Sequence, residues 1–389
     1  MTPPPGAGVR DEAERVIRAW DAHETARGAR PVIDYDCAPP PPGAPAIAPA
    51  TSRLAVLARL TELRDKAGGT AVADALDAHV AYLGHVLGER PPLEPYVERT
   101  QGIRPVPSPA GHAERIEARA RQAAGDLGLA WGPRTMADLA PLDGVIDLQE
   151  ARDRVVDVAA AAEPAVRALA GTDARYEVRI EVVEVDDYWA YWLDGAGSQV
   201  RLRFNLRHAR FTESRLRQFA LHELLGHALQ SASYAARAAD GDVPWLRLLS
   251  TNLPYQVCLE GLATALPLLV APDDELLRAR VRIDHHVHLV RAAVHLAVNH
   301  GEPLTGIAAE TRRRIPWWDD ARISDELADR GTDPMLRSYL WSYAAGTDWF
   351  VALADEADGA AKQRVLRAAY AAPLTPADLR GLWPGGPWP

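Results

Sequence analysis

The pattern of hydrophobic and polar positions predicts helices over most of this chain. Apolar residues recur at intervals of three to four in residues 11–27, 52–87, 111–127 and 135–169, with Gly or Pro at the breaks. This spacing puts apolar side chains on one face of a helix, where they can pack against a core. Residues 37–49 are rich in proline and predict an extended, polyproline-like arm.

The period changes to two between residues 176 and 206. Apolar residues alternate with charged or polar ones in two runs: Tyr176, Val178, Ile180 and Val182, then Val200, Leu202, Phe204 and Leu206. Because an Asp194-Gly195 turn signal lies between the runs, they predict a small antiparallel sheet, which we expect to be the only sheet. The second run leads into Thr212, a predicted N-cap with Glu213 in the first helical turn.

These elements predict a mainly α fold with one small antiparallel β-sheet. The length of 389 residues, with 48% hydrophobic and 25% charged residues, is typical of a globular protein with a large core. We expect an N-terminal helix with the proline-rich arm in residues 1–50 and a helical scaffold in residues 51–171. Residues 172–389 would carry the sheet and form one compact unit with the scaffold.

Charge and targeting features narrow the function classes. The net charge is −10 and the arginines are scattered among acidic residues, so we expect no nucleic-acid partner. No run approaches about 18 consecutive apolar residues, and residues 1–6 lack a basic region followed by an apolar one, so we expect no membrane span and no secretion signal. Cys37 and Cys258 are too few for a disulfide framework, and Cys258 is expected to be a small core residue. A cytoplasmic protein fits these features.

The segment Leu221-His222-Glu223-Leu224-Leu225-Gly226-His227 places two imidazoles and a carboxylate in a strongly helical run. The two histidines are five positions apart, which on a regular α-helix would separate their directions by about 140°. Both can bind one ion only if the turn between them is widened, as in a π-helix. We expect glycine at Gly226 because a side chain there would crowd a neighbouring helix.

A zinc site needs a third protein ligand, with water in the fourth position if the site is catalytic. Glu260 offers one, because it lies in the apolar run 257–270, which predicts a buried helix. A carboxylate buried there without a partner would be costly. A cation is the expected partner, although a buried arginine would serve as well.

Two later helical segments carry further candidate residues. Asp284 and His288 share a helix face in a histidine-rich segment, a pattern that is also typical of an exposed polar helix. Tyr339, Tyr343 and Gly346 share one face of another helix. Aromatic residues at this spacing more often belong to a core than to a catalytic site.

Several segments together resemble the bacterial family called domain of unknown function 885. They are His222-Glu223-x-x-Gly226-His227-x-x-Gln230, Glu260-Gly261-Leu262-Ala263, Arg280-x-x-x-Asp284-x-x-x-His288 and Tyr343-x-x-Gly346, in this order. The resemblance covers residues 176–382 and implies the zincin-like helical fold of gluzincin-type zinc metallopeptidases. The His-Glu-Leu-Leu-Gly-His spelling also resembles dipeptidyl peptidase III, another zinc peptidase family, whose downstream Glu motif matches less well.

The resemblance implies roles for individual residues. His222, His227 and Glu260 would be the ligands of Zn²⁺, or of another divalent metal such as Fe²⁺. Glu223 would be the general base on the water that attacks the substrate.

The remaining candidates would act around this centre. His288 and Tyr343 are candidates to stabilise the oxyanion, while Asp284, Gln230 and Asn205 are candidates to orient these groups or to contact the substrate. The chain also departs from the family. It is shorter, it has one residue fewer between the two histidines and no proline there, and Leu262 and Pro267 stand where the family has a Trp and an acid.

We therefore expect a zinc-dependent peptidase or amide hydrolase that acts on a peptide or a small amide-containing substrate. A strand next to the metal site could bind an extended peptide by edge pairing, although such a strand also serves as scaffold. An alternative is a metalloenzyme of specialised metabolism that uses the same site on a small molecule in a non-peptidase reaction. A third option is a binding protein that has lost turnover, against which the retained Glu223 argues.

Overall fold

Helices make up most of the chain. The computed structural model describes residues 7–186, 190–328 and 333–387, so residues 1–6, in which no secretion signal is expected, lie outside the described part. The described helices, with one π-helical segment η1, are α1 Ala7–Ala26, α2 Arg53–Ala67, α3 Ala71–Val86, α4 Leu93–Gln101, α5 His112–Asp126, α6 Thr135–Asp143, α7 Leu148–Ala170, α8 Glu213–Phe219, η1 Ala220–Ala228, α9 Leu229–Asp240, α10 Gln256–Val270, α11 Glu275–Asn299, α12 Leu304–Arg314, α13 Asp320–Ala328, α14 Pro334–Glu356, α15 Gly359–Ala371 and α16 Pro376–Leu382. The predicted mainly α fold is confirmed.

Glycines and capping residues divide the predicted helical stretches. Residues 52–87 form two helices, α2 and α3, because Gly69 takes a positive φ of 66° and Thr70 then caps α3. Residues 135–169 likewise form α6 and α7, and the Asp147 side chain caps the second. Residues 37–49 contain neither helix nor strand, as their prolines predict.

The main sheet has five strands and is mixed rather than antiparallel. Its order is β3-β5-β4-β1-β7, formed by Glu177–Val183, Gln199–Asn205, Tyr191–Ala196, Tyr35–Asp36 and Leu248–Leu249. The two strands predicted from alternation, β3 and β5, run parallel, with Val178 opposite Val200. The antiparallel prediction is wrong because Asp194 and Gly195 are not a turn. They belong to a further strand, β4, which pairs antiparallel with β5.

Very short strands from distant segments complete the sheets. β1 comes from the N-terminal residues 1–50 and pairs parallel with β4 and antiparallel with β7. A second sheet joins β2, Val145–Ile146, to β6, Phe211–Thr212, so the expectation of a single sheet is wrong as well. Strands of two residues are too short to produce an alternating pattern in a sequence.

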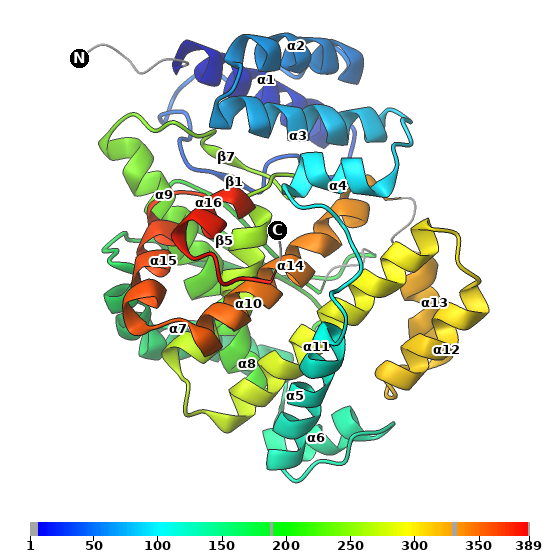
Figure 1. Cartoon of the computed structure of the whole chain (residues 1–389). Coiled ribbons are helices and arrows are strands. Elements are labelled where there is room, and N and C mark those ends of the chain that lie inside the picture. The colour runs from blue at the N-terminus through cyan, green and yellow to red at the C-terminus, as the bar shows by residue number, and fades with distance from the viewer. Residues whose placement is uncertain (1–6, 187–189, 329–332, 388–389) are drawn as a thin grey trace.

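The core runs through the middle of the molecule. α10 is buried from Gln256 to Leu268 and packs against α14 and η1. Figure 1 shows α10 and α14 crossing the centre, with α1, α2 and α3 at the top, α5 and α6 at the bottom, and α12 and α13 at one side. Cys258 is fully buried in α10, as predicted. The most deeply buried helix is therefore the one that carries Glu260.

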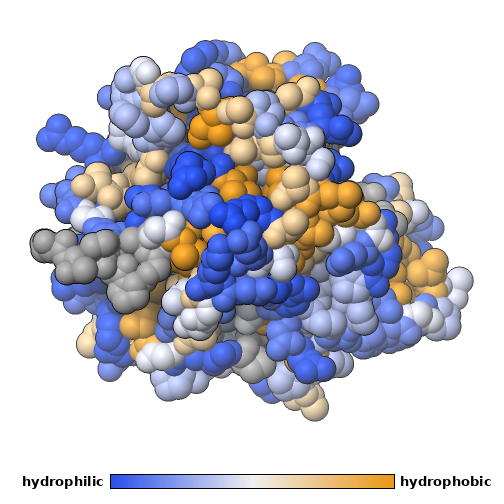
Figure 2. All heavy atoms as spheres, turned by 90° about the horizontal axis from the view of Figure 1, so that it is seen from above, coloured by the Kyte–Doolittle hydropathy of each residue, from blue (hydrophilic) through white to orange (hydrophobic). Residues whose placement is uncertain are grey.

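Hydrophilic side chains cover much of the surface. Seen from above, apolar side chains form separate patches among polar and charged ones (Figure 2). Arginines pair with acidic residues across elements, as Arg247 does with Asp11 and Glu14, in agreement with the scattered charge pattern of the sequence. None of the described helices combines the length and the apolar character needed to cross a membrane.

Candidate metal centre

The helix that carries the two histidines is anchored at its start. Thr212 caps α8 by accepting a hydrogen bond from the Arg215 main-chain N–H, as predicted. The Thr212 hydroxyl also donates to the buried Asp143 carboxylate, which forms an ion pair with Arg280 of α11. Since α8 continues directly into η1, this anchor helps to set the position of both histidines.

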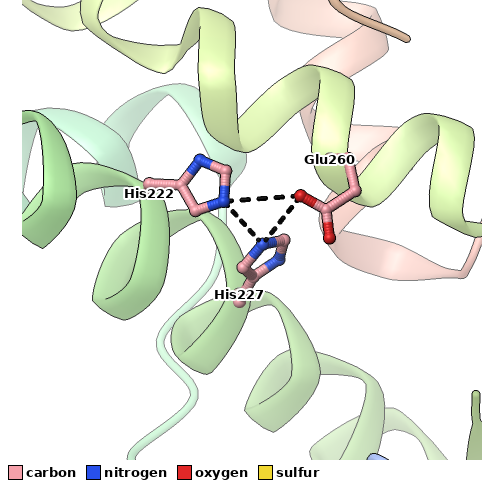
Figure 3. A group of neighbouring side chains, drawn as sticks. All are labelled: His222, His227 and Glu260. Carbon is pink, nitrogen blue, oxygen red and sulfur yellow. Dashed lines mark hydrogen bonds and ion pairs between the residues drawn. The ribbon is translucent and has the colours of Figure 1, made fainter. Parts of the chain in front are cut away.

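The turn between His222 and His227 is π-helical. At the end of η1 the Leu229 main-chain N–H bonds to the Leu224 carbonyl, five residues back. In such a widened helix five residues make about one full turn. His222 and His227 therefore direct their imidazoles to the same side of the helix. Their Nε2 atoms are 3.1 Å apart (Figure 3). The predicted widened turn is confirmed.

Three glycines let the surrounding helices approach closely. A Cβ atom on Gly226 would lie 2.6 Å from the Cβ of Ala263 on α10, so a side chain would crowd that helix, as predicted. Where α10 meets α14, a Cβ on Gly261 would lie 2.3 Å from the Gly346 main chain. Only glycine fits at these helix spacings. The close packing brings Glu260 and the tyrosines of α14 next to η1.

Glu260 faces both imidazoles from the neighbouring helix. Its Oε2 atom lies 3.4 Å from Nε2 of His222 and 3.6 Å from Nε2 of His227 (Figure 3). Its Oε1 atom accepts a hydrogen bond from the Tyr339 hydroxyl. Burial pushes the pKa of Glu260 upward, but the two imidazoles outweigh burial and hold this pKa well below its usual range. The carboxylate is therefore ionised and directed at the histidine pair.

The three side chains match the donor set and spacing of a zinc site. Ligand atoms around a tetrahedral zinc ion, with bonds of about 2.0–2.1 Å, lie about 3.3–3.4 Å from one another. The corresponding atoms of His222, His227 and Glu260 are 3.1, 3.4 and 3.6 Å apart. Oε2 of Glu260 is buried and, within the described chain, has no hydrogen bond of ordinary geometry. A cation between the three ligand atoms would give this oxygen its partner.

Glu223 lines the same pocket, next to the first histidine. Burial raises the pKa of Glu223 to about 7; His222 opposes this shift and the Glu260 carboxylate adds to it. A bound cation would lower this pKa again. A carboxyl group that titrates near or below neutrality can accept a proton and return it, as a general base must.

A pocket opens in front of the three candidate ligands. Its wall comes from η1, α9, α10, α14 and the sheet, and consists of Asp34, Tyr35, Tyr191, Trp192, Leu193, His222, Glu223, His227, Ser231, Leu249, Thr251, Gln256, Leu259, Glu260, Tyr339 and Tyr343. The hydroxyl groups of Tyr339 and Tyr343 are 3.3 Å apart. Burial, with the Glu260 carboxylate, raises the pKa of Tyr343 well above its usual range. The Tyr343 hydroxyl therefore stays protonated and can donate a hydrogen bond.

The candidate residues of α11 lie behind the pocket wall. The His288 ring packs against the Tyr343 ring, with centroids 5.3 Å apart, and its Nδ1 lies 3.2 Å from Oγ1 of Thr347. Asp284 accepts a hydrogen bond of 2.7 Å from Gln218 of α8. α11 thus contacts both the helix that leads to the histidines and the tyrosine in the pocket.

The other two histidines of this segment are buried, whereas His288 is half-buried. Nε2 of His285 lies 2.7 Å from Oδ1 of Asp348, and Nε2 of His286 lies 3.0 Å from the Arg314 carbonyl. Both rings are almost fully covered. The interpretation of this segment as an exposed polar helix is therefore wrong.

Gln230 and Asn205 lie away from the pocket wall. Gln230 donates a hydrogen bond of 2.8 Å to the Ala369 carbonyl of α15. Asn205 donates one of 3.0 Å to the Val185 carbonyl, just beyond β3. Neither belongs to the described residues that line the pocket. Their contacts connect α9 to α15 and the end of β5 to the chain after β3.

Sequence reasoning did not identify Tyr339 as a partner of Glu260, or Asp34 as a pocket residue. A signal existed for Tyr339, since a residue four positions before Tyr343 shares its helix face. No local signal pointed to Asp34, which reaches the pocket through the pairing of β1 with β4.

The comparisons with known proteins bear on the fold. No family model and no curated protein matches the chain, so the resemblance to domain of unknown function 885 and to dipeptidyl peptidase III stays a prediction. A putative lipoprotein from Colwellia psychrerythraea is similar in structure, with a TM-score of 0.55 and 14% identity over 84% of this chain. This chain spans 58% of that protein, less than two thirds of its length. An M32 carboxypeptidase from Deinococcus radiodurans R1 gives a TM-score of 0.38 and 15% identity, covering 97% of this chain and 76% of that one.

Proposed function

We propose that this protein is a zinc-dependent peptidase or amide hydrolase. The proposal rests on one observation, the convergence of His222, His227 and Glu260 in a pocket that Glu223 also lines. Two imidazoles and one carboxylate are a ligand set of catalytic zinc sites, which keep a fourth position for water. Bound Zn²⁺ would polarise a substrate carbonyl and lower the pKa of water towards 7.

Each of the residues around the candidate ligands would have a separate role in the reaction. Glu223 would take a proton from the attacking water and return it to the leaving amine. Tyr343 would donate a hydrogen bond to the oxygen of the tetrahedral intermediate, because its hydroxyl stays protonated. Tyr339 would hold Glu260 through its hydrogen bond, and His288 would position the Tyr343 ring.

Strand β4 supports a peptide as the substrate. β4 pairs with β1 only at Gly195 and Ala196, and the Gly195 N–H bonds to the Asp34 carbonyl. Residues two apart in a strand point their main-chain N–H and C=O groups to the same side. Those of Leu193 and Tyr191 therefore point to the same edge of β4 as the Gly195 N–H, at positions that precede the start of β1. Both residues line the pocket. An extended peptide could therefore pair with this edge of β4.

Metal analysis of the purified protein tests the ligand set. We expect one divalent ion per chain, and loss of that ion in His227→Ala. His208→Ala removes an exposed histidine outside the site and should keep the ion, which makes it the control. Full metal occupancy in His227→Ala would overturn the proposal.

A peptide-library digest tests the reaction. Glu223→Gln should keep the metal and lose activity by about 10²-fold to 10⁴-fold, because the amide cannot take up the proton of the attacking water. Loss of metal from this variant would make Glu223 a ligand and the site one of another kind. A metal-loaded wild-type protein that cleaves no peptide or amide bond would contradict the proposal and favour a different reaction on a small molecule.

A further inference from the structure

Asp34 is a carboxyl group of the pocket that neither the ligand set nor the general base uses. It directly precedes β1. Its main-chain N–H bonds to the Leu249 carbonyl at 2.9 Å, and its carbonyl accepts a bond of 3.1 Å from the Gly195 N–H. Strands β7 and β4 therefore hold its backbone from both sides. The sheet thus fixes where this residue meets the pocket, whose wall also includes Glu260.

No ion pair reaches the Asp34 carboxyl within the part of the chain that the structure describes. Its Oδ2 atom is buried and has no hydrogen-bond partner in the described part of the chain, while the residue as a whole stays partly exposed. Burial, together with the Asp194 carboxylate, raises the pKa of Asp34 to about 8. The described residues that line the pocket include no lysine or arginine. Ionisation of such a carboxyl is costly unless a cation binds beside it.

The position of Asp34 along β4 determines which part of a substrate would meet it. β1 already occupies the β4 edge at Gly195 and Ala196. A peptide paired with Leu193 and Tyr191 would therefore lie in line with β1 and end near Asp34. A group placed against this carboxyl is favoured if it is an ammonium and disfavoured if it is a carboxylate.

We propose that Asp34 binds a protonated amino group of the substrate and so selects the substrates that the pocket accepts. The inference rests on the proposed peptidase function and deepens it. The amino group is either the N-terminus of a peptide or a lysine side chain, which offer the same chemistry. Either one would form a charge-assisted hydrogen bond with the carboxylate.

Equilibrium binding tests this role without relying on turnover. Zinc-loaded Glu223→Gln protein is titrated with three peptides: tetra-alanine, N-acetyl-tetra-alanine, and the acetylated peptide with one alanine replaced by lysine. We expect an amine-containing peptide to bind about tenfold to a hundredfold more tightly than N-acetyl-tetra-alanine. Adding Asp34→Asn should remove this difference. The peptide that loses affinity shows whether the N-terminus or the lysine side chain is bound.

Matched variants guard against a structural explanation. Asp240→Asn makes the same acid-to-amide change at the exposed end of α9 and should leave the preference intact. Asp34→Glu keeps the charge and should retain part of the preference, which provides the readout if Asp34→Asn does not fold. Equal binding of the three peptides, no binding of any, or a preference that persists in folded Asp34→Asn would overturn the inference.

The proposed reaction and the role of Asp34 can fail separately. If the amine preference depends on Asp34 but wild-type protein cleaves no peptide, the reaction is wrong and the role of Asp34 stands. If wild-type protein cleaves tetra-alanine, N-acetyl-tetra-alanine and the acetylated lysine peptide equally well, the reaction stands and the role of Asp34 is wrong.

Discussion

Glu260 uses its two carboxylate oxygens in different ways. Oε1 accepts the hydrogen bond from Tyr339, and Oε2 faces the imidazoles of His222 and His227. A carboxylate held in this way presents its second oxygen in a fixed direction, as the outer partners of metal ligands commonly ensure. Tyr339 would therefore act on a bound metal through Glu260, whereas Tyr343 would act on the substrate.

Tyr339→Phe should weaken zinc affinity about 10-fold to 100-fold, because Glu260 would lose the bond that orients it. Competition with a chromophoric chelator measures this affinity. Tyr343→Phe removes the same hydroxyl group four residues later and should affect zinc affinity much less, while it lowers the hydrolysis rate. Equal effects of the two variants on zinc affinity would contradict this division of roles.

The convergence of the three candidate ligands could be predicted from sequence better than the residues around them. His222 and His227 lie in one helix, so their spacing alone required a π-like turn if they were to share an ion. Tyr339 was visible only as one of two aromatic residues on a helix face, since its bond to Glu260 depends on how α14 packs against α10. Asp34 had no local pattern, because its place depends on strand pairing between distant segments.

Among the elements, strands were harder to predict than helices. Alternation correctly indicated β3 and β5, but a period of two does not specify the partner of a strand. Gly195 looked like part of a turn, whereas it permits the close approach of β1. A Cβ on Gly195 would lie 2.7 Å from the Tyr35 ring. Glycine is thus needed at this position for close packing and not for a turn. β1, which packs there, pairs parallel with β4 and contributes to the mixed sheet.

Gly226→Ala should lower the free energy of unfolding by about 1–3 kcal/mol, because the added Cβ would push α10 away from η1. It should also weaken zinc binding, since α10 carries Glu260. Denaturant titration and metal titration measure the two effects.

Gly125→Ala is the matched control for this variant. Gly125 is exposed on α5 and an added Cβ there meets nothing within 4 Å, so the change should stabilise the protein by up to about 1 kcal/mol. A Gly226→Ala protein with wild-type stability and zinc affinity would show that η1 and α10 do not need this close approach.

On the scale of the whole molecule, the pocket collects segments from across the sequence. β1 comes from the N-terminal part, β4 and η1 from the middle, and α10 and α14 from the C-terminal half, where Figure 1 shows them crossing the centre. The spacing of apolar residues predicted most of these elements individually. Their arrangement could not be predicted, because it depends on glycine contacts between helices and on two-residue strands that leave no periodic pattern.

A bound ion would link two parts of the core, since His222 and His227 belong to η1 and Glu260 belongs to α10. Removing it with a chelator should therefore lower the free energy of unfolding, by about 2.7 kcal/mol relative to protein in free zinc at a hundred times Kd. Scanning calorimetry with and without chelator measures the shift in Tm. The chelator should leave the Tm of His227→Ala unchanged, because that variant has lost the site. If the wild-type Tm also stays constant while metal analysis shows that zinc has been removed, the ion does not bind between η1 and α10.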